Sequence, residues 1–150
     1  MFILDASVLV KLFRTEDDSA TARESVRLAI RRQRPLLAPS LVLYEMLTVA
    51  LHYEISFEIP LMLLTDLRNV GFTLVEPTTE ELLLAGQIAS SRHNDRGHPQ
   101  LEDSIYHAMA IERGGVFITA DRKHIEKTAH LGHIALLADW RPDLPTPPHP

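Results

Sequence analysis

Two short apolar segments, far apart in the chain, each end at an aspartate, and this pattern constrains the fold more than any other feature. One covers residues 1–5 and ends at Asp5, and the other covers residues 115–121 and ends at Asp121. A continuously apolar stretch of this length is typical of a strand that is buried on both faces of a parallel sheet. Because ligand sites in open α/β sheets gather at the carboxyl ends of the strands, the two aspartates are expected to meet in one crevice.

The rest of the chain predicts helices that alternate with further short strands. Strands are expected at residues 2–5, 36–38, 72–75, 115–121 and 134–137, and helices at residues 8–13, 16–34, 40–53, 58–69, 78–92, 101–113 and 122–131. This alternation favours an α/β fold with a central parallel sheet of four to five strands and helices on both faces. Residues 1–140 are predicted to form a single domain, residues 141–150 a Pro-rich C-terminal tail, and the polar residues 93–99 a loop.

Composition limits the classes of function. The chain has 150 residues, which suits one domain, and a net charge of −5 from 15 basic and 20 acidic residues. Proteins that bind nucleic acid through bulk electrostatics are usually basic, so a nucleic-acid substrate would require bound cations or a local basic patch here. The absence of cysteine excludes disulfides and thiolate metal sites. There is neither a signal peptide nor an apolar run of about 18 residues, so we expect a cytoplasmic protein with no membrane association.

Two carboxylates are unusual because they occur in helices that are otherwise apolar. Glu45 is the only charged residue in the predicted helix 40–53, and its neighbours are apolar nearly all round, so this helix should be largely buried. A buried, ionised carboxylate is costly unless it is paired or coordinates a metal, and no basic residue lies one helical turn away. Asp103 lies in the first turn of the predicted helix 101–113, where the helix dipole favours a negative charge.

Four carboxylates therefore stand out as candidate site residues: Asp5, Glu45, Asp103 and Asp121. Each alone has a structural explanation, since an aspartate can cap the following helix and Glu45 could pair with a distant arginine. All four, however, fall at strand ends or in the first turns of the following helices, which is one edge of a parallel sheet. Carboxylates that converge there would repel one another without a divalent cation. Oxygen ligands without Cys or His favour Mg²⁺ or Mn²⁺ over Zn²⁺, and such an ion points to phosphodiester hydrolysis.

The segments that carry these carboxylates follow one another in a recognisable order: residues 3–10, the isolated Glu45, residues 102–110 and residues 116–123. In sequence and spacing they resemble the PIN-domain nucleases, and most of all the VapC-type toxins of bacterial toxin–antitoxin modules. The resemblance extends from residue 1 to about residue 137. It implies a Rossmann-like PIN fold, a homodimer, a protein antitoxin as partner and Mg²⁺- or Mn²⁺-dependent endoribonuclease activity on an RNA substrate.

The resemblance also implies roles for individual residues. The catalytic and metal-binding residues would be Asp5, Glu45, Asp103 and Asp121, and the supporting hydroxyls would be Ser7 and Thr119. In the family a further acidic residue often follows the last aspartate by two or three positions, but this chain has Lys123 and His124 there. The departure leaves open whether catalysis uses one ion or two. Sequence specificity for RNA would reside in grooves and loops such as residues 93–100.

Other functions fit the residues less well. A phosphatase of the haloacid dehalogenase type also begins with a strand that ends in a nucleophilic aspartate. It needs a second acid two residues later, where this chain has Ser7. A receiver-like domain would not need the buried Glu45, and the chain has no Gly-rich nucleotide-binding loop. The alternative that stays open is a degenerate PIN fold that acts only as a protein-binding or assembly module.

The histidines have an ordinary structural explanation beside a functional one. His124, His130 and His133 are the closest set, but they match no compact metal-binding motif, so we predict that they are surface residues. His107 is predicted to be a neutral core residue, with contact to substrate as the alternative.

The helices expected at residues 40–53 and 58–69 also allow two interpretations. The second helix carries more apolar residues than one core-facing stripe needs, namely Leu61, Met62, Leu63, Leu64 and Leu67. Ordinary core packing explains each residue singly. Together the two helices could instead form a dimer face or an antitoxin groove.

Overall fold

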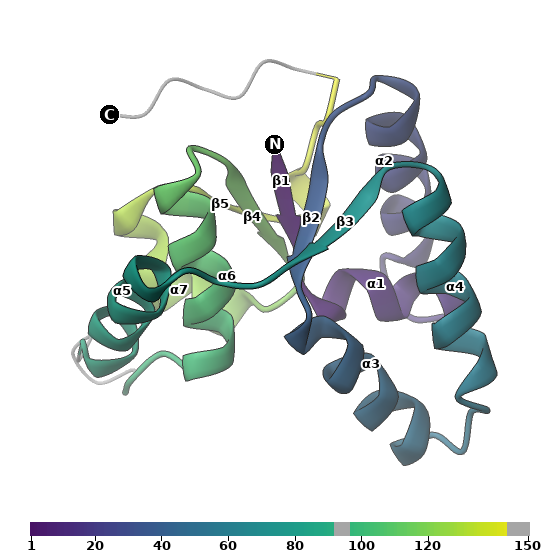
Figure 1. The fold of residues 1–150 in the computed structure, drawn as a ribbon, viewed down its shortest axis with the longest axis horizontal. Coiled ribbons are helices and arrows are strands. Elements are labelled where there is room, and N and C mark those ends of the chain that lie inside the picture. Colours follow the sequence, from purple (N-terminus) through teal and green to yellow (C-terminus); the bar gives the residue numbers. More distant parts are fainter. Residues whose placement is uncertain (92–96, 144–150) are drawn as a thin grey trace.

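A parallel sheet with the strand order β3-β2-β1-β4-β5 lies at the centre of the computed structural model (Figure 1). The structure describes residues 1–91 and 97–143, and within them the sheet has five strands. The strands are β1 (Phe2–Leu4), β2 (Leu36–Pro39), β3 (Phe72–Val75), β4 (Val116–Thr119) and β5 (Ile134–Leu136). Ile3 of β1 is in register with Leu37 of β2 and with Phe117 of β4. The two aspartate-terminated strands are therefore neighbours at the centre of the sheet.

Helices cover both faces of the sheet. They are α1 (Ala6–Phe13), α2 (Ser19–Arg31), α3 (Leu41–His52), α4 (Glu58–Asn69), α5 (Thr79–Ser90), α6 (Leu101–Glu112) and α7 (Arg122–Thr128), with the 3₁₀ helices η2 (Ala129–Leu131) and η3 (Leu137–Asp139) on either side of β5. In Figure 1, α1 to α4 lie on one side of the sheet and α5 to α7 on the other. The predicted α/β fold, with four to five parallel strands and helices on both faces, is confirmed.

The topology has a switch point beside β1. From β1 the chain builds outward through β2 to β3, and it then returns through α5 and α6 to place β4 and β5 on the opposite side of β1. In doubly wound sheets the crevice outside the strand ends at such a point is where ligands bind. Here that crevice lies between the ends of β1 and β4.

The predicted strands and helices correspond to the observed ones, and the differences lie at their ends. Helix α1 starts at Ala6, two residues earlier than predicted, because the Asp5 carboxylate caps it by accepting a hydrogen bond from the backbone N–H of Val8. Helix α2 starts at Ser19 rather than at residue 16, because the Ser19 hydroxyl accepts a hydrogen bond from the backbone N–H of Glu16 and holds that turn outside the helix.

The C-terminal part of the chain shows two further points. The helix predicted at 122–131 is α-helical only to Thr128 and then tightens into η2. Residues 92–96 and 144–150 lie outside the described residues, and they include most of the predicted loop 93–99 and tail 141–150. No helix of the described residues is long and apolar enough to cross a membrane.

The core is built on the two central strands. Ile3, Leu4, Phe117 and Ile118 are completely buried, and Tyr106 of α6 stacks on Phe117 with 5.6 Å between ring centroids. Strands buried on both faces are the reason that these segments read as continuous apolar runs.

Helix α3 is less buried than its apolar sequence predicted. Val42, Met46 and Ala50 are buried, but Tyr44 and Leu51 are 65% and 69% exposed. The buried residues follow one another at intervals of four, so only one stripe of α3 packs against the rest of the protein. The prediction that this helix is largely buried is therefore wrong. Its predicted cap, Ser40, occupies the N-cap position without a capping side-chain hydrogen bond.

Some apolar residues of helix α4 pack in the core, and others are exposed. Leu64 and Leu67 are buried in the core, whereas Leu61 and Met62 are 43% and 66% exposed. We call four exposed, non-aromatic apolar side chains of α3 and α4 the α3–α4 apolar surface: Leu51, Ile59, Leu61 and Met62.

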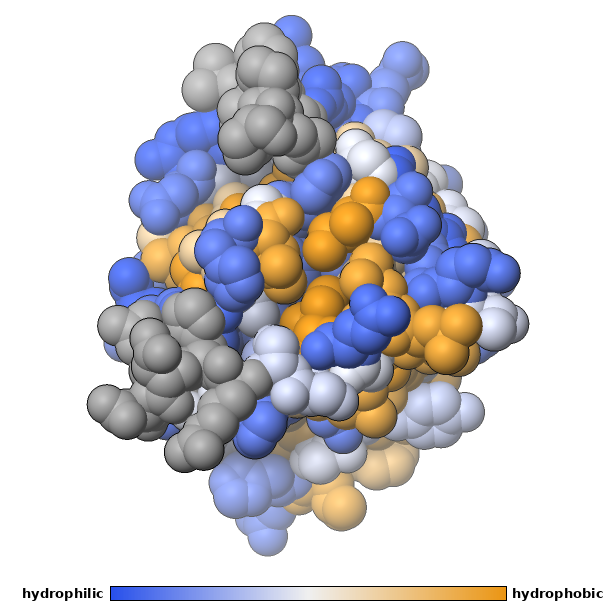
Figure 2. Space-filling view, turned by 90° about the vertical axis from the view of Figure 1, so that its left-hand side faces the viewer, coloured by the Kyte–Doolittle hydropathy of each residue, from blue (hydrophilic) through white to orange (hydrophobic). Residues whose placement is uncertain are grey.

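The opposite side of the molecule also exposes apolar side chains. Figure 2 views the side of α5 to α7 and shows hydrophobic atoms gathered in the middle of that face, with hydrophilic ones around them. The exposed leucines of these helices are Leu82 and Leu83 of α5 and Leu101 of α6.

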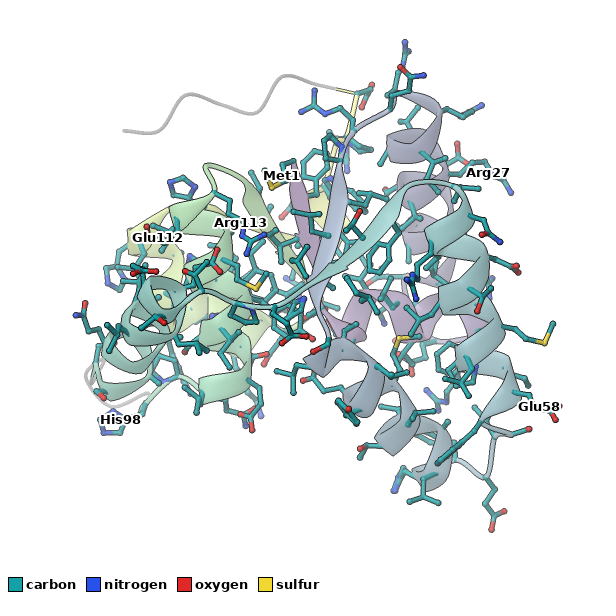
Figure 3. All side chains as sticks on the ribbon, viewed as in Figure 1. Met1, Arg27, Glu58, His98, Glu112 and Arg113 are labelled. Atoms are coloured by element: carbon teal, nitrogen blue, oxygen red, sulfur yellow. The ribbon has the colours of Figure 1, made fainter. Side chains whose placement is uncertain are left out.

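A buried ion pair joins α5 to the end of α6. The Glu81 side chain is 3% exposed and accepts hydrogen bonds from Nε and Nη2 of Arg113, which is labelled in Figure 3. Glu81 also accepts a hydrogen bond from the backbone N–H of Thr78, and its own N–H donates to the Thr78 hydroxyl, which completes a capping box at the start of α5. Arg113 holds the pKa of the Glu81 carboxyl below its usual value.

Replacing Arg113 by Met should lower the free energy of unfolding by about 2–3 kcal/mol, because it leaves the Glu81 carboxylate buried and without its cation. Urea unfolding followed by circular dichroism measures the loss. The matched control is Arg31→Met, because Arg31 pairs with Glu24 at an exposed site and should change stability by about 0.5 kcal/mol or less. Equal losses in the two variants would show that the Arg113 pair does not clamp α5 to α6.

Candidate active site

The carboxylate of Asp5 is fixed at the carboxyl end of β1. It is buried and caps α1, and its Oδ1 accepts hydrogen bonds from the Ser7 hydroxyl at 2.6 Å and from the Val8 backbone N–H at 3.1 Å. Its Oδ2 accepts a hydrogen bond from the Thr119 hydroxyl at 2.6 Å. Thr119 is the last residue of β4, so this bond joins the ends of the two central strands.

The same two hydroxyls hold the backbone that carries Asp121. The backbone N–H of Ala120 donates to Ser7 Oγ at 2.8 Å, and that of Asp121 donates to Thr119 Oγ1 at 3.0 Å. Each hydroxyl thus donates to Asp5 and accepts from the segment after β4. Asp121 then caps α7 by accepting from the backbone N–H of Lys123 at 2.8 Å. Ser7 and Thr119 were predicted as supporting residues, and they link the two aspartates.

Glu45 has a partner that sequence reasoning missed. The Tyr106 hydroxyl of α6 donates a hydrogen bond to Glu45 Oε2, whereas the structural alternative considered from the sequence was a distant arginine. Tyr106 is completely buried, so it fixes the half-buried Glu45 from the core side. The signal was present in the sequence, because Tyr106 follows Asp103 by three residues and therefore lies on the same face of α6.

Asp103 lies in the first turn of α6 beside a buried histidine. Its Oδ2 is 3.8 Å from Nδ1 of His124, whose side chain is 1% exposed. Burial lowers the pKa of His124 to about 4, so the ring is neutral at neutral pH and the contact is not an ion pair. The prediction that His124 is a surface residue is wrong, because the first turn of α7 turns its ring toward Phe117 and His107, each with 5.7 Å between centroids.

His107 is a neutral core residue, as predicted. It is completely buried, and its Nε2 donates a hydrogen bond to the Gly132 carbonyl at 2.7 Å. Burial lowers its pKa to about 4. His130 and His133 were predicted, with His124, to be surface residues. His130 is exposed, and His133 is half-buried.

The pKa shifts of the predicted carboxyl groups indicate that these groups lie in one cluster. Burial raises the pKa of Asp5 to about 6, against the hydrogen bonds of Ser7, Thr119 and Val8, and the charge of Glu45 raises it further. Burial also raises the pKa of Asp103 to about 7, with contributions from the charges of Asp5, Asp121 and Glu102. The pKa of Glu45 is raised by burial and by Asp103. These carboxyl groups are close enough to destabilise one another's ionised forms.

An open groove of about 1010 Å³ runs past this cluster. Its lining includes Ser7, Glu45 and Asp121, and it continues along α1 and α3 past Lys11 and Tyr44. Asp5 lies beneath this surface, since it is 4% exposed and is not part of the lining. The groove gives an extended substrate access to Glu45 and Asp121.

The carboxylate oxygens of this cluster are chemically suited to a hard divalent cation. The cluster offers carboxylate oxygens whose mutual repulsion a cation would relieve, and such oxygens suit Mg²⁺ or Mn²⁺. Within residues 1–91 and 97–143, however, no group of three or more His, Asp or Glu side chains is already gathered tightly enough to enclose an ion. That Asp5, Glu45, Asp103 and Asp121 bind metal therefore stays a prediction.

Comparison with known proteins identifies the family. A model of the PIN domain matches residues 2–131. The chain belongs to the PIN domain family. The predicted resemblance is thereby confirmed at the level of the family, and no significant match was found among proteins of curated function.

Solved structures share the fold of this PIN domain. PAE2754 from Pyrobaculum aerophilum is 19% identical, and the match covers 91% of this chain and 89% of that one with a TM-score of 0.62. VapC20 from Mycobacterium tuberculosis, described as a toxin that cleaves the sarcin–ricin loop, is 14% identical, and the match covers 89% of this chain and 96% of that one with a TM-score of 0.67. At these identities the likeness concerns the fold.

In the metal-free PIN domain the raised carboxyl pKa values should lower stability as the pH rises from about 4 to about 7, whereas the lowered pKa values of His107 and His124 act in the opposite direction over the same range. Asp5 and Asp103 have raised pKa values of about 6 and about 7. The unfolded chain therefore ionises first, near pH 4, and binds fewer protons than the native state across this window. Asp5 alone should account for about 3 kcal/mol. Thermal unfolding in EDTA at several pH values measures the effect.

Relative to wild type, Asp5→Asn should gain stability as the pH rises over this range, because its neutral amide keeps the shape of the side chain without the buried charge and the two histidines contribute equally in both proteins. The matched control is Asp66→Asn on the exposed side of α4, which should retain the wild-type slope. A stability difference between Asp5→Asn and wild type that stays constant over the same pH window would contradict the raised pKa of Asp5.

Proposed function

We propose that this PIN domain is a Mg²⁺- or Mn²⁺-dependent endoribonuclease that hydrolyses RNA phosphodiester bonds, and that it is the toxin of a type II toxin–antitoxin module. The observation that carries the proposal is the cluster of Asp5, Glu45 and Asp103, carboxyl groups whose pKa values are raised first by burial and then by the charges of neighbouring carboxylates. Proteins retain such an arrangement for function, because a scaffold gains no stability from it. PIN domains are generally nucleases, which agrees with this chemistry.

The chain's own residues would prepare the site for hydrolysis. Asp5, Glu45, Asp103 and Asp121 would hold the ion, which supplies charge neutralisation of the phosphate and activation of the attacking water. Ser7 and Thr119 keep both oxygens of Asp5 oriented, and Tyr106 does the same for Glu45. Water attacks phosphorus, and the P–O bond to the neighbouring nucleotide breaks. Rigid carboxylates avoid reorganisation during this step.

The substrate and the biological role rest on the family resemblance. RNA is proposed because VapC-type toxins act on RNA, whereas the target named for VapC20 belongs to that protein. We propose that the protein acts in the cytoplasm, where its RNA substrate would be found.

Two partners accompany the proposed role, an antitoxin and a second copy of the chain. The support for a protein partner is the α3–α4 apolar surface, where Leu51 and Met62 are 69% and 66% exposed. Large apolar side chains exposed on neighbouring helices are typical of protein-binding faces.

The central test combines metal binding with cleavage. Wild type should bind Mg²⁺ or Mn²⁺ in calorimetry and should cleave a structured RNA only when the metal is present. Asp5→Asn should lose both properties, with cleavage reduced by at least about 100-fold, because the buried carboxylate can no longer neutralise the ion. Gel analysis of end-labelled RNA measures cleavage, and Asp66→Asn should behave as wild type.

The degenerate alternative predicts a different outcome. A wild type, free of copurified partner, that bound neither ion and cut no RNA would contradict the nuclease proposal. In that case the double variant Asp5→Asn, Asp121→Asn, which keeps a side-chain oxygen at each helix cap, should be as stable as wild type or more stable, and it should bind protein partners equally well.

The α3–α4 apolar surface makes a separate prediction about assembly. Met62→Glu should shift the chain from dimer to monomer in analytical ultracentrifugation, because a charge in a buried apolar contact is costly. Leu83→Glu, on the opposite side of the molecule, is the matched control, since Leu83 is also strongly exposed. If wild type is already monomeric, the homodimer is excluded and the surface remains assigned to the antitoxin.

A further inference from the structure

We propose that Tyr44 is a stacking platform for an unpaired RNA base beside the carboxylate cluster, so that the substrate presents a single-stranded nucleotide next to the cleaved bond. The inference rests on the proposed nuclease function and specifies how its substrate is held. Proteins read single-stranded RNA by stacking splayed bases on aromatic side chains, which a fully paired duplex does not offer.

The position of Tyr44 suits this role. It directly precedes Glu45 on α3, lines the same groove and is 65% exposed. Within the described part of the chain, the ring of Tyr44 contacts no other ring and no cation, so a face is available to a ligand. Its backbone is fixed, because its carbonyl accepts a hydrogen bond from the Thr48 hydroxyl at 2.8 Å.

The ring of Tyr53, the other tyrosine of the groove, already contacts two side chains. The guanidinium of Arg14 lies over the Tyr53 ring, 3.5 Å from its centroid, and His52 packs edge-on against the same ring at 4.7 Å. Arg14 is itself paired with Glu16. Tyr53 therefore forms part of the groove wall, and Tyr44 is the aromatic ring that a base can reach.

The charges of the groove favour a contribution from stacking. Lys11 is the basic residue among the described lining residues, and its Nζ is bound to Glu16 Oε2 at 3.1 Å and to the Asp17 carbonyl at 2.8 Å. The lining also carries the carboxylates of Glu16, Glu45, Glu102 and Asp121. Such a surface attracts a phosphate backbone poorly, so affinity for RNA has to come from the bound cation and from contacts with bases.

The test compares Tyr44→Ala and Tyr44→Phe with wild type. The probe is a fluorescein-labelled single-stranded oligoadenylate, measured by fluorescence anisotropy with Ca²⁺ as the divalent ion. Tyr44→Ala should weaken binding by about 5- to 150-fold, which corresponds to the loss of one stacked base. Tyr44→Phe should bind as wild type, because it keeps the ring. Phe57→Ala, an exposed aromatic residue outside the groove lining, is the matched control and should also bind as wild type.

An oligonucleotide of the same length with abasic riboses separates stacking from other effects. Wild type and Tyr44→Ala should bind the abasic probe equally, since neither can stack on it. The inference is overturned if Tyr44→Ala binds oligoadenylate as tightly as wild type, if it loses affinity equally for both probes, or if wild type prefers neither probe. Unchanged thermal unfolding of Tyr44→Ala confirms that the variant is folded.

The cleavage assay keeps this inference distinct from the nuclease proposal. If wild type cleaves RNA with Mg²⁺ and Tyr44→Ala cleaves it with the same kcat/KM, only the stacking inference fails. If wild type never cleaves RNA, the nuclease proposal fails, and the anisotropy results still decide whether Tyr44 binds a base. Tyr44→Ala that binds both probes as wild type but loses a protein partner would assign the residue to protein docking and overturn the stacking inference.

Discussion

The hydrogen bonds from Ser7, Val8 and Thr119 to the Asp5 carboxylate determine the arrangement of the whole site. They bind the end of β1 to the end of β4 and cap the first helix. The same hydroxyls position the backbone before Asp121. A carboxylate suits this place because a single acceptor group has to satisfy two donors from the first turn of α1 and one from the end of β4. The consequence is a buried negative charge at the switch point of the sheet.

The molecule uses buried carboxylates in two opposite ways. Glu81 is paired with Arg113, its pKa is lowered, and its charge stabilises the contact between α5 and α6. Asp5 is buried and Asp103 half-buried among other carboxylates, and their pKa values are raised to about 6 and about 7. The first arrangement makes the fold more stable, whereas the second makes it less stable in the absence of a cation. This difference in sign separates structural acids from candidate catalytic acids, although both are buried aspartates or glutamates.

Local patterns predicted much of the fold and most of the candidate cluster. The apolar runs before Asp5 and Asp121 identified the central strands, because a strand buried on both faces leaves no polar position. The isolated Glu45 was identifiable because charge is rare in an apolar helix. Its neighbour Tyr106 was missed, since the spacing from Asp103 shows which face of α6 it occupies but not that its hydroxyl reaches a carboxylate 61 positions away in the chain. The burial of α3 was overestimated for the related reason that hydrophobicity does not say which neighbours a helix will have.

The sequence by itself determined which segments become strands and helices and which acids stand near their ends, because these depend on periodicity, caps and residue type within a few positions. Only the tertiary structure decided which side chains from distant segments lie next to one another. It placed His124 in the core beside Asp103, gave Glu45 a tyrosine as its partner, covered Tyr53 with Arg14 and left Tyr44 open in the groove. These outcomes depend on contacts between distant segments, and such contacts are fixed only when the helices pack on the two faces of the sheet.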